Sequence, residues 1–361
     1  MGEPHRVGIV GLGVISAQYL DTLLPRDDLR VVAVADLERA RATAVADSIP
    51  GANALTVAEL LRSDEVDLVL NLTIPAAHAE IALAAIAAGK DVYGEKPLAA
   101  TFADATRIVE QADAVGVRLG CAPDTVLGTG VQTARAAIDG GAIGRPLAAS
   151  AVFVSPGHER WHPNPDFYYQ PGGGPLLDMG PYYIAALVHL LGPVIAVIGA
   201  GSSLRNERTI ATGQRAGERV AVGVNTHVTG VLEHESGALS TVTTSFDAVS
   251  TRAGNIEVHG ELASLSVPDP NHFTGAVELH RLGASEWEVA EPSAGLVNGS
   301  RGVGLLDLLA TPRGQDSRAS GRFALHALEV MTALLESTQT GQRITLETTV
   351  ARPPIMPLGS A

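Results

Sequence analysis

The first 121 residues alternate between short apolar runs and amphipathic stretches with the spacing of helices. Apolar runs of this kind are typical of strands buried on both faces of a parallel sheet. The expected strands are 7–10, 29–35, 66–72, 91–93 and 117–121. The expected helices are 16–24, 39–48, 57–62, 75–88 and 102–115. Strands that alternate with helices predict an α/β fold with a Rossmann-type, doubly wound parallel sheet.

The pattern changes after Asp124. Helices are predicted at 129–139, 176–191 and 325–337, and strands at 146–155, 220–229, 239–245, 255–260 and 262–267. Successive strands without crossover helices predict a mostly antiparallel, open sheet in an α+β domain. We therefore expect a dinucleotide-binding domain at 1–124 and a substrate-binding and oligomerisation domain at 125–361. Segments 206–218 and 298–322 are rich in Gly, Arg and Ser and are predicted to be mobile loops.

Charge and cysteine content exclude several classes of protein. A net charge of −14 argues against a nucleic-acid partner and against an anionic membrane surface. The apolar segment 181–200 is interrupted by His189 and Pro193, so it predicts a buried helix followed by a strand rather than a membrane span. A single cysteine, Cys121, excludes a disulfide framework and a Cys-rich zinc site, and it fits a cytoplasmic location.

A glycine-rich turn, Gly11-Leu-Gly13-Val-Ile-Ser16, joins the first expected strand to the first helix. Gly11 permits a tight turn, and Gly13 lets the backbone approach a pyrophosphate at the helix N-terminus. Asp36 ends the second strand, where a carboxylate accepts hydrogen bonds from ribose hydroxyls and repels a 2′-phosphate. The turn therefore predicts a bound dinucleotide and favours NAD. Two arginines that follow, Arg39 and Arg41, keep NADP possible.

Two further strand ends belong to the same edge of the predicted sheet. Thr73-Ile74-Pro75 and His78 follow the third strand, and Glu95-Lys96-Pro97 follows the fourth. Ligands bind outside the carboxyl ends of parallel strands, so we expect Lys96 to lie where chemistry occurs. A purely structural role for His78 is an equal alternative. The predicted cofactor contacts are Gly11, Gly13, Val14, Ile15, Asp36, Thr73, Pro75, His78, Glu95 and Lys96.

Asp178 and Tyr182 are four residues apart, so on a helix they share one face. Oxidation of a secondary alcohol sends a hydride to a nicotinamide and a proton to a base whose pKa is best near 7. An ammonium group beside a tyrosine lowers the pKa of its hydroxyl. We hypothesise that Tyr182 is the acid/base, Lys96 its electrostatic partner and Asp178 the orienting group. Simple core packing of Tyr182 is the alternative.

Segment 156–174 is a predicted loop rich in Pro, Gly, His and aromatic residues. Aromatic faces stack on sugar rings, and histidines bond to hydroxyls, so the loop is predicted to bind substrate. A structural loop packed by aromatics is an equal alternative. A metal site at His158, Glu159 and His162 is not favoured because no helix holds them together, and no metal is expected. The predicted substrate contacts are Lys96, Asp124, His158, Trp161, His162, Tyr168, Asp178 and Tyr182.

These motifs, in this order, resemble the glucose-fructose oxidoreductase / inositol dehydrogenase / MocA (Gfo/Idh/MocA) family. The matching pieces lie before residue 200 and are the glycine-rich turn, Pro75 with His78, Ala88-Gly89-Lys90, Glu95-Lys96-Pro97, Gly141-Ala-Ile-Gly144, Gly172-Gly-Gly and Asp178-x-Gly180. The resemblance implies an NAD(P)-dependent dehydrogenase or reductase of a small polyhydroxylated substrate, namely a sugar, cyclitol or related polyol. It also implies a homodimer or homotetramer formed through the C-terminal sheet.

The resemblance assigns Lys96 to the nicotinamide and the reacting hydroxyl, and it maps the family's Asp before the Gly onto Asp178. Many members carry a catalytic His four residues after this Asp, where this chain has Tyr182; glucose-fructose oxidoreductase and dihydrodiol dehydrogenase are similar to it there. Two other functions stay open on the same scaffold. One is an NAD-retaining lyase or glycosidase that oxidises its substrate transiently, and the other is a non-catalytic, cofactor-binding regulator. Net NADH formation distinguishes the dehydrogenase from both.

Overall fold

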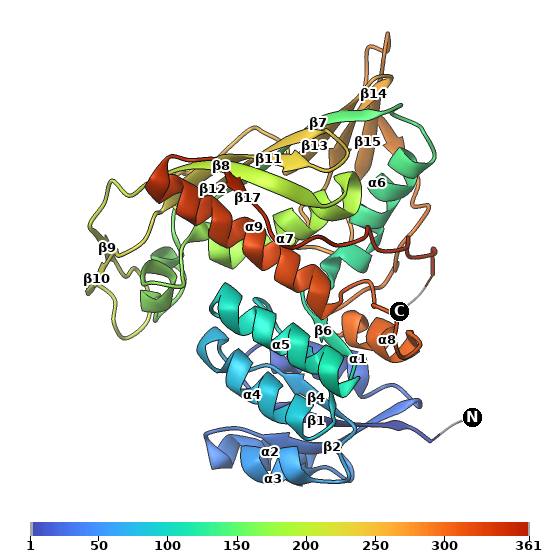
Figure 1. Ribbon diagram of the computed structural model, residues 1–361. Coiled ribbons are helices and arrows are strands. Elements are labelled where there is room, and N and C mark those ends of the chain that lie inside the picture. The colour runs from blue at the N-terminus through green and yellow to red at the C-terminus, as the bar shows by residue number, and fades with distance from the viewer. Residues whose placement is uncertain (1–2, 360–361) are drawn as a thin grey trace. The chain divides into compact units, whose positions relative to one another are not determined.

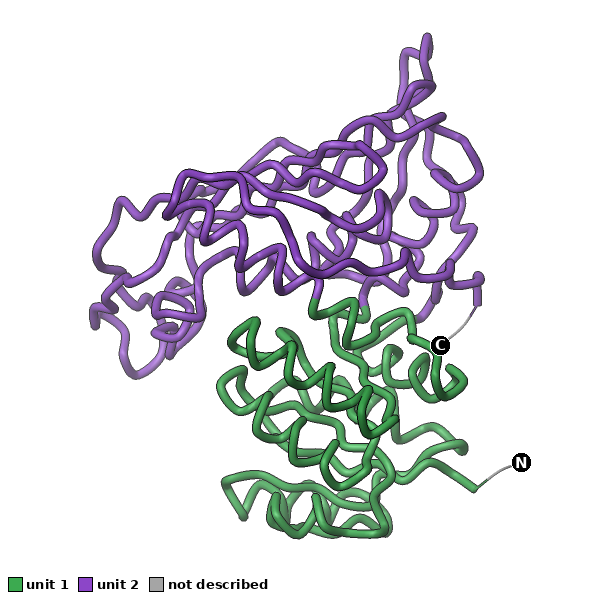
Figure 2. Tube along the Cα trace, in the orientation of Figure 1, with its two compact units in different colours: residues 1–124, 299–325, 361 green, residues 125–298, 326–360 purple. Residues whose placement is uncertain are grey.

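The computed structural model of the chain describes residues 3–359, which form two compact units (Figure 2). Of the described residues, those up to Asp124 and Gly299–Leu325 form the first unit. Thr125–Asn298 and the residues from His326 onward form the second. The first unit therefore includes a segment, Gly299–Leu325, that we had expected in the second domain at 125–361.

A six-stranded sheet forms the centre of the first unit, in the order β3-β2-β1-β4-β5-β6 (Figure 1). All of its pairings are parallel, which confirms the predicted doubly wound sheet. The strands are β1 (His5–Val10), β2 (Leu29–Ala35), β3 (Asn53–Ala54), β4 (Leu68–Asn71), β5 (Asp91–Gly94) and β6 (Leu119–Cys121). The helices are α1 (Ser16–Leu23), α2 (Arg39–Ser48), α3 (Val57–Arg62), α4 (Pro75–Ala87), α5 (Phe102–Val115) and α8 (Val303–Ala310).

Local sequence explains where these helices begin and end. The N-cap of α5 is Thr101, whose hydroxyl accepts a hydrogen bond from the backbone N–H of Asp104. The same helix ends at Gly116, which adopts a left-handed conformation with φ +79°. Helix α3 begins with a capping box between Thr56 and Glu59.

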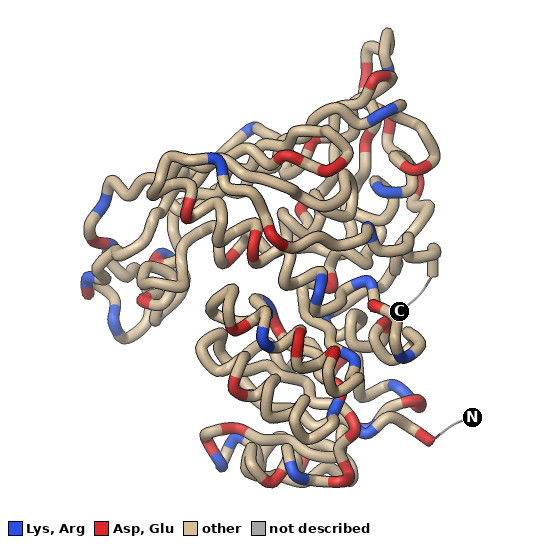
Figure 3. The backbone as a smooth tube through the Cα atoms, viewed as in Figure 1, with Lys and Arg blue, Asp and Glu red and all other residues tan. Residues whose placement is uncertain are grey.

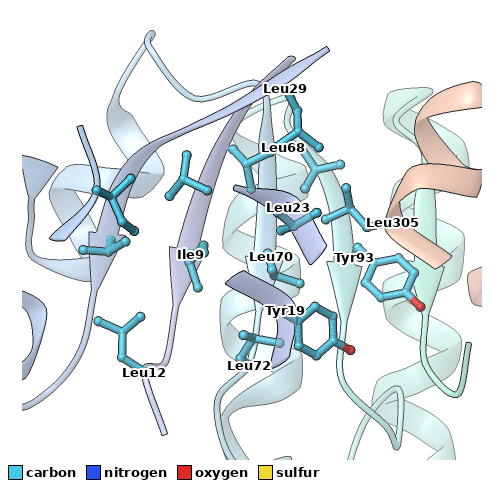
Figure 4. Packing of buried hydrophobic residues seen from close by; sticks show 14 of the residues in the cluster. Ile9, Leu12, Tyr19, Leu23, Leu29, Leu68, Leu70, Leu72, Tyr93 and Leu305 are labelled. Carbon is cyan, nitrogen blue, oxygen red and sulfur yellow. The ribbon is translucent and has the colours of Figure 1, made fainter. Parts of the chain in front are cut away.

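The core of the first unit explains why Gly299–Leu325 belongs to it. Leu305 and Leu308 of α8 are buried in the same apolar cluster as Tyr93 of β5 and Ile9 of β1 (Figure 4). A Cβ at Gly304 would overlap the ring of Tyr93, so only glycine allows α8 to approach β5 this closely. The helix is thus specified by long-range packing.

The second unit is built on a nine-stranded sheet in the order β16-β15-β14-β13-β7-β12-β11-β8-β17 (Figure 1). Only the pair formed by β12 and β7 is parallel among the strands described in this sheet, so the predicted, mostly antiparallel sheet is confirmed. The strands are β7 (Pro146–Val154), β8 (Val194–Ser202), β11 (His227–His234), β12 (Leu239–Ser245), β13 (Ile256–Gly260), β14 (Ala263–Val267), β15 (Val277–Arg281), β16 (Glu288–Ala290) and β17 (Ile344–Thr345). A separate hairpin pairs β9 (Glu207–Thr209) with β10 (Arg219–Ala221).

Three helices complete the described part of the second unit: α6 (Thr129–Asp139), α7 (Pro175–Leu191) and α9 (Gly321–Thr340), whose first residues belong to the first unit. Helix α7 packs against β7, β11 and β12. Short 3₁₀ turns are η1 (Thr125–Leu127), η2 (His158–Arg160) and η3 (Asp166–Tyr169). Segment 181–200 divides into α7 and β8, as predicted, and no helix among residues 3–359 is long and apolar enough to cross a membrane.

Three local predictions are wrong. The expected strand 220–229 is instead parts of β10 and β11, because the chain leaves the hairpin at Ala221 and enters the large sheet at His227. The expected loop 298–322 contains α8, and the expected loop 206–218 contains β9. β9 is formed by local pairing with β10, whereas α8 is held by packing against a core distant in sequence.

Candidate functional site

The register of the first sheet brings the predicted cofactor residues to one edge. Val10 pairs with Ala35 and Asn71, Asn71 pairs with Gly94, and Gly94 pairs with Cys121. These residues end β1, β2, β4, β5 and β6, so the turns that follow all leave the sheet at the same edge. Ligands of open α/β sheets bind at this edge.

Backbone geometry at the glycine-rich turn separates the roles of its two glycines. Gly11 has φ +93°, and a Cβ there would lie 2.7 Å from the carbonyl carbon of Leu72 and 2.8 Å from the backbone nitrogen of Thr73. A Cβ at Gly13 would have no described protein atom within 4 Å. Gly11 is therefore required by the fold, whereas Gly13 leaves open space in front of the N-terminus of α1.

Asp36 is fixed at the end of β2. Its Oδ2 accepts a hydrogen bond from the backbone N–H of Leu12 at 2.8 Å, and its Oδ1 accepts one from the N–H of Glu38 at 2.8 Å. Arg41 donates to the same Oδ1 at 3.1 Å. Burial raises the pKa of Asp36, but the two N–H groups and Arg41 outweigh it and hold that pKa below its ordinary value. The group is a preformed, charged carboxylate at the position expected for ribose.

Three large apolar side chains at this edge are exposed. Val14 is 96% exposed after β1, Leu37 is fully exposed after β2, and Ile74 is 69% exposed after β4. Apolar side chains gathered at a strand edge are typical of a ligand-binding surface. Together with the open space at Gly13, they fit a dinucleotide, whose adenine and nicotinamide faces would cover them.

The Glu95-Lys96-Pro97 segment is held by its backbone. Tyr19 of α1 donates its hydroxyl to Glu95 Oε1 at 2.8 Å, and the N–H of Lys96 donates to Glu95 Oε2 at 3.0 Å. The Lys96–Pro97 peptide bond is cis. Both carboxylate oxygens of Glu95, which we predict to contact the cofactor, thus have protein partners: Tyr19 holds Oε1, and Oε2 holds the backbone of Lys96. Tyr19 is a supporting residue that the sequence did not indicate.

His78 joins the two neighbouring turns. Its Nδ1 lies 2.6 Å from the carbonyl oxygen of Pro97, its Nε2 lies 2.9 Å from that of Thr73, and the side chain is buried. These contacts favour the structural alternative for His78, because its ring contacts protein atoms through both nitrogens. Asn71 supports the same region: its Oδ1 accepts a hydrogen bond from the Thr73 hydroxyl at 2.6 Å. Asn71 was missed, although a polar residue that ends a buried apolar strand is a usable signal.

Asp124 does not have the position expected of a substrate ligand. It is fully buried, and its Oδ2 accepts hydrogen bonds from the N–H groups of Gly302 at 2.7 Å and Gly304 at 3.2 Å. Burial raises the pKa of Asp124 to about 6, although Arg301 and these two N–H groups act in the opposite direction. Asp124 therefore caps the N-terminus of α8, which favours a structural role over the predicted substrate contact.

In the second unit, Asp178 lies in the first turn of α7 with Tyr182 one turn later. His158 reaches Asp178 from η2, with its Nε2 at 2.8 Å from Asp178 Oδ2. The side chain of His158 is only 9% exposed and that of Asp178 is 17% exposed. The contact brings together two predicted substrate residues, but burial of His158 makes Asp178 the more accessible member.

The remaining predicted substrate residues form an aromatic group on the same loop. The ring of His162 packs 5.4 Å from that of Trp161 and 5.6 Å from that of Tyr168, measured between centroids. Trp161 is 59% exposed. The loop therefore presents an open indole face, while its other rings pack on one another. No group of three metal-ligating side chains occurs among the residues that the structure describes.

Sequence comparison gives independent information on both units. Residues 5–122 match the family described as "Oxidoreductase family, NAD-binding Rossmann fold", and residues 131–266 match the "GFO/IDH/MocA C-terminal domain". The chain belongs to the Gfo/Idh/MocA oxidoreductase family. Its first unit is an NAD-binding Rossmann domain, as predicted.

Curated members of the Gfo/Idh/MocA family include "Inositol 2-dehydrogenase 3" of Saccharopolyspora erythraea, 36% identical over 158 residues, which are 42% of this chain and 45% of that protein. The "1,5-anhydro-D-fructose reductase" of Ensifer adhaerens is 32% identical over 61% of this chain and 67% of that protein. This chain thus spans less than half the length of the first relative and about two thirds of the second. A solved levoglucosan dehydrogenase, in complex with NADH and levoglucosan, has the same fold, with a TM-score of 0.80, 20% identity, and coverage of 96% of this chain and 100% of that one.

Substitution of the two glycines in the Gfo/Idh/MocA fingerprint should have separable effects. Gly13→Ala is expected to leave the free energy of unfolding within about 0.5 kcal/mol of the parent, since no described atom contacts the new methyl group. It should weaken NADH binding about tenfold or more, because the methyl group enters the space expected for the pyrophosphate. Gly11→Ala should destabilise the protein by about 2–4 kcal/mol through strain and overlap with Leu72.

Urea unfolding and NADH fluorescence titration measure the two effects. Parental NADH affinity in Gly13→Ala would contradict the assignment of this turn to the cofactor. Gly51→Ala is a suitable comparison for strain alone, because Gly51 has φ +82° and a Cβ added there would have no described protein atom within 4 Å.

Proposed function

We propose that this chain is an NAD-dependent dehydrogenase or reductase that transfers a hydride between nicotinamide and a secondary hydroxyl, or the matching ketone, of a sugar, cyclitol or related polyol. The observation that carries the proposal is Lys96, a cationic side chain whose backbone is fixed by Glu95 at the ligand-binding edge of an NAD-binding sheet. Two relatives, an inositol dehydrogenase and an anhydrofructose reductase, support this substrate class.

The chemical roles follow from the charges of these side chains. Bound NAD supplies the acceptor or donor for the hydride. Lys96 polarises the reacting oxygen. Tyr182 takes the hydroxyl proton during oxidation and returns it during reduction. Asp178 accepts a hydrogen bond from a substrate hydroxyl and so orients the ring.

The loop between β7 and α7 supports a polyhydroxylated substrate. Trp161 offers an exposed aromatic face, on which the apolar face of a sugar or cyclitol ring stacks. Charged residues are mixed in sign along both units, without a continuous run of Lys and Arg in the view of Figure 3. A neutral, hydroxyl-rich ligand suits this loop better than a polyanion.

Cofactor binding and turnover test the proposal in two stages. NADH and NADPH are titrated first, and NADH should bind at least about tenfold more tightly because Asp36 repels a 2′-phosphate. Absorbance at 340 nm is then followed with NAD and a panel that contains myo-inositol, levoglucosan and common aldoses, and with NADH and 1,5-anhydro-D-fructose. Net NADH formation or consumption supports the proposal.

Other outcomes identify the alternatives. Substrate conversion without net NADH would indicate a lyase or glycosidase that retains its cofactor. A flat trace with every substrate, despite tight NADH binding, would favour a regulator. Preference for NADPH would contradict the role of Asp36 and would direct attention to Arg41, which pairs with it.

We also propose that the protein forms a homodimer or homotetramer through the large sheet of the second unit. The cross-strand residues Ile198, Val231 and Thr241 lie in register on β8, β11 and β12, and all three are uncharged. Ile198 is 44% exposed. Light scattering should give a mass of two or four chains, and a monomer at micromolar concentration would contradict this proposal.

A further inference from the structure

The contact between His158 and Asp178 is built into the second unit by a buried network. η2, which carries His158, begins after Gly157, whose φ is +107°. The N–H of His158 donates to the Tyr169 hydroxyl at 3.1 Å, and that hydroxyl donates to Glu159. The backbone on both sides of His158 is therefore fixed before any ligand binds.

An arginine anchors this network to the hairpin and the large sheet. Arg208 of β9 donates to Glu159 Oε1 at 3.3 Å and to the carbonyl oxygen of Phe246 at 3.2 Å, and it also pairs with Asp247. The side chains of Arg208 and Glu159 are almost fully buried. A buried charge pair is costly to break, because removal of one partner leaves the other uncompensated. The position of η2 is thus strongly determined.

Aromatic packing then fixes the imidazole ring of His158. Its centroid lies 4.3 Å from that of Tyr168, 4.4 Å from that of Phe246 and 5.1 Å from that of Trp161. Held in this way, the ring presents Nε2 to Asp178. Its Nδ1 is buried and has no hydrogen-bond partner among the residues that the structure describes. This favours the neutral tautomer with the proton on Nε2, since a carboxylate only accepts.

We propose that His158 is the positioning residue of Asp178: it donates Nε2–H to Oδ2 and so fixes the direction in which the carboxylate meets the substrate. The role rests on the proposed function, because it concerns the same site. It gives His158 a role through Asp178 in place of the predicted direct contact with substrate. A misplacement of about 1 Å near the reacting centre costs on the order of a hundredfold in rate.

Three substitutions separate the hydrogen bond from the packing. His158→Gln keeps a donor near the Nε2 position, His158→Asn has an amide that stops short of Asp178, and His158→Phe keeps the ring but has no donor. We expect kcat to fall about tenfold to a hundredfold in the Phe and Asn variants and to recover most of that loss in the Gln variant. NADH affinity should stay within about twofold in all three. His272→Gln, with a side chain 70% exposed, is the control for histidine loss.

Equal kcat in His158→Phe and the parent, or equal loss in the Gln and Asn variants with parental melting temperatures, would overturn the proposal. If the Phe variant does not fold, the Gln and Asn pair decides.

If the parent itself shows no turnover, the proposed function fails, and the positioning contact is judged by imidazole ¹⁵N NMR. The His158 signal, assigned by its loss in His158→Gln, should show the Nε2–H tautomer, and its Nε2 signal should shift in Asp178→Leu, which has no acceptor. An Nδ1–H tautomer in the parent would reject the inference.

Discussion

Lys96→Met is expected to lower kcat by about 10²–10⁴-fold with the substrates that the parent turns over, while NADH affinity changes only a few-fold. Methionine keeps the length and apolar stem of lysine but removes the ammonium group. Because Glu95 holds the backbone N–H of residue 96 rather than its side chain in this contact, the turn should keep its shape. The loss should therefore appear in the chemical step.

The chain contains only two lysines, so the second one provides a matched control for the loss of a lysine ammonium group. The other, Lys90, is buried, and its Nζ donates to the carbonyl oxygens of Ser63 at 2.7 Å and Val66 at 2.8 Å. Lys90→Met should reduce stability rather than catalysis. Tyr182→Phe completes the test of the proposed proton transfer. Hydride-transfer rates within about threefold of the parent in both Lys96→Met and Tyr182→Phe would exclude their assigned roles.

Acidification between pH 6.5 and 4 is expected to destabilise the second unit by about 3 kcal/mol for each of two buried histidines. Burial lowers the pKa of His234 and of His326 from 6.5 to about 4. The unfolded chain therefore takes up protons in this range that the folded chain does not. The contribution of these two histidines to the free energy of unfolding is complete above pH 6.5 and is lost as the pH falls toward 4.

Burial keeps both rings neutral, and their hydrogen bonds show what protonation would disturb. His326 Nε2 accepts the backbone N–H of Val194 at 3.1 Å, so protonation would remove an acceptor at the start of β8. His234 lies between the carbonyl oxygen of Gly192 at 2.8 Å and the Ser240 hydroxyl at 2.7 Å. When the Ser240 hydroxyl donates to His234, Nε2 must keep its lone pair, so protonation of the ring would remove this hydrogen bond.

Urea unfolding at pH 7.5 and pH 5 measures the predicted slope. His234→Gln and His326→Gln should each be less stable than the parent at pH 7.5 but lose less free energy of unfolding on acidification. His272→Gln should retain the parental slope, because that histidine is exposed. An unchanged slope in both buried-histidine variants would show that other groups control acid stability.

Which parts of the fold were predictable depends on where the specifying interactions lie. Helices 39–48, 57–62, 102–115 and 129–139 agree with the structure residue for residue, because their start and stop signals are local. Helix α8 was missed because the residues that specify it are distant in sequence. Asp124 caps its N-terminus, and Tyr93 packs so closely against it that only glycine fits at position 304. The composition of segment 298–322, which is typical of a loop, gives no indication of contacts with Asp124 and Tyr93.

The candidate site also contains residues that the sequence could predict and residues that it could not. The strand-end positions of Gly11, Asp36 and Lys96 at one sheet edge were predictable, because they follow from strand order alone. Asp124 also ends a strand, yet it points into the protein, and sequence position did not distinguish the two outcomes. The pairing of His158 with Asp178 depends on a loop of 19 intervening residues and on Arg208, so no spacing rule could predict it.

Segment Gly299–Leu325, which returns to the first unit, has a consequence for synthesis on the ribosome. Leu305 and Leu308 complete the core around Tyr93, but about 200 residues separate Asp124 from the end of this segment. At about 5–20 residues per second, translation takes roughly 10–40 s to cover that distance. During this time the nascent cofactor-binding unit exposes an apolar surface, and the Asp124 carboxylate lacks the N–H donors of Gly302 and Gly304. We expect the NAD-binding unit to become resistant to protease only after the second unit has been made.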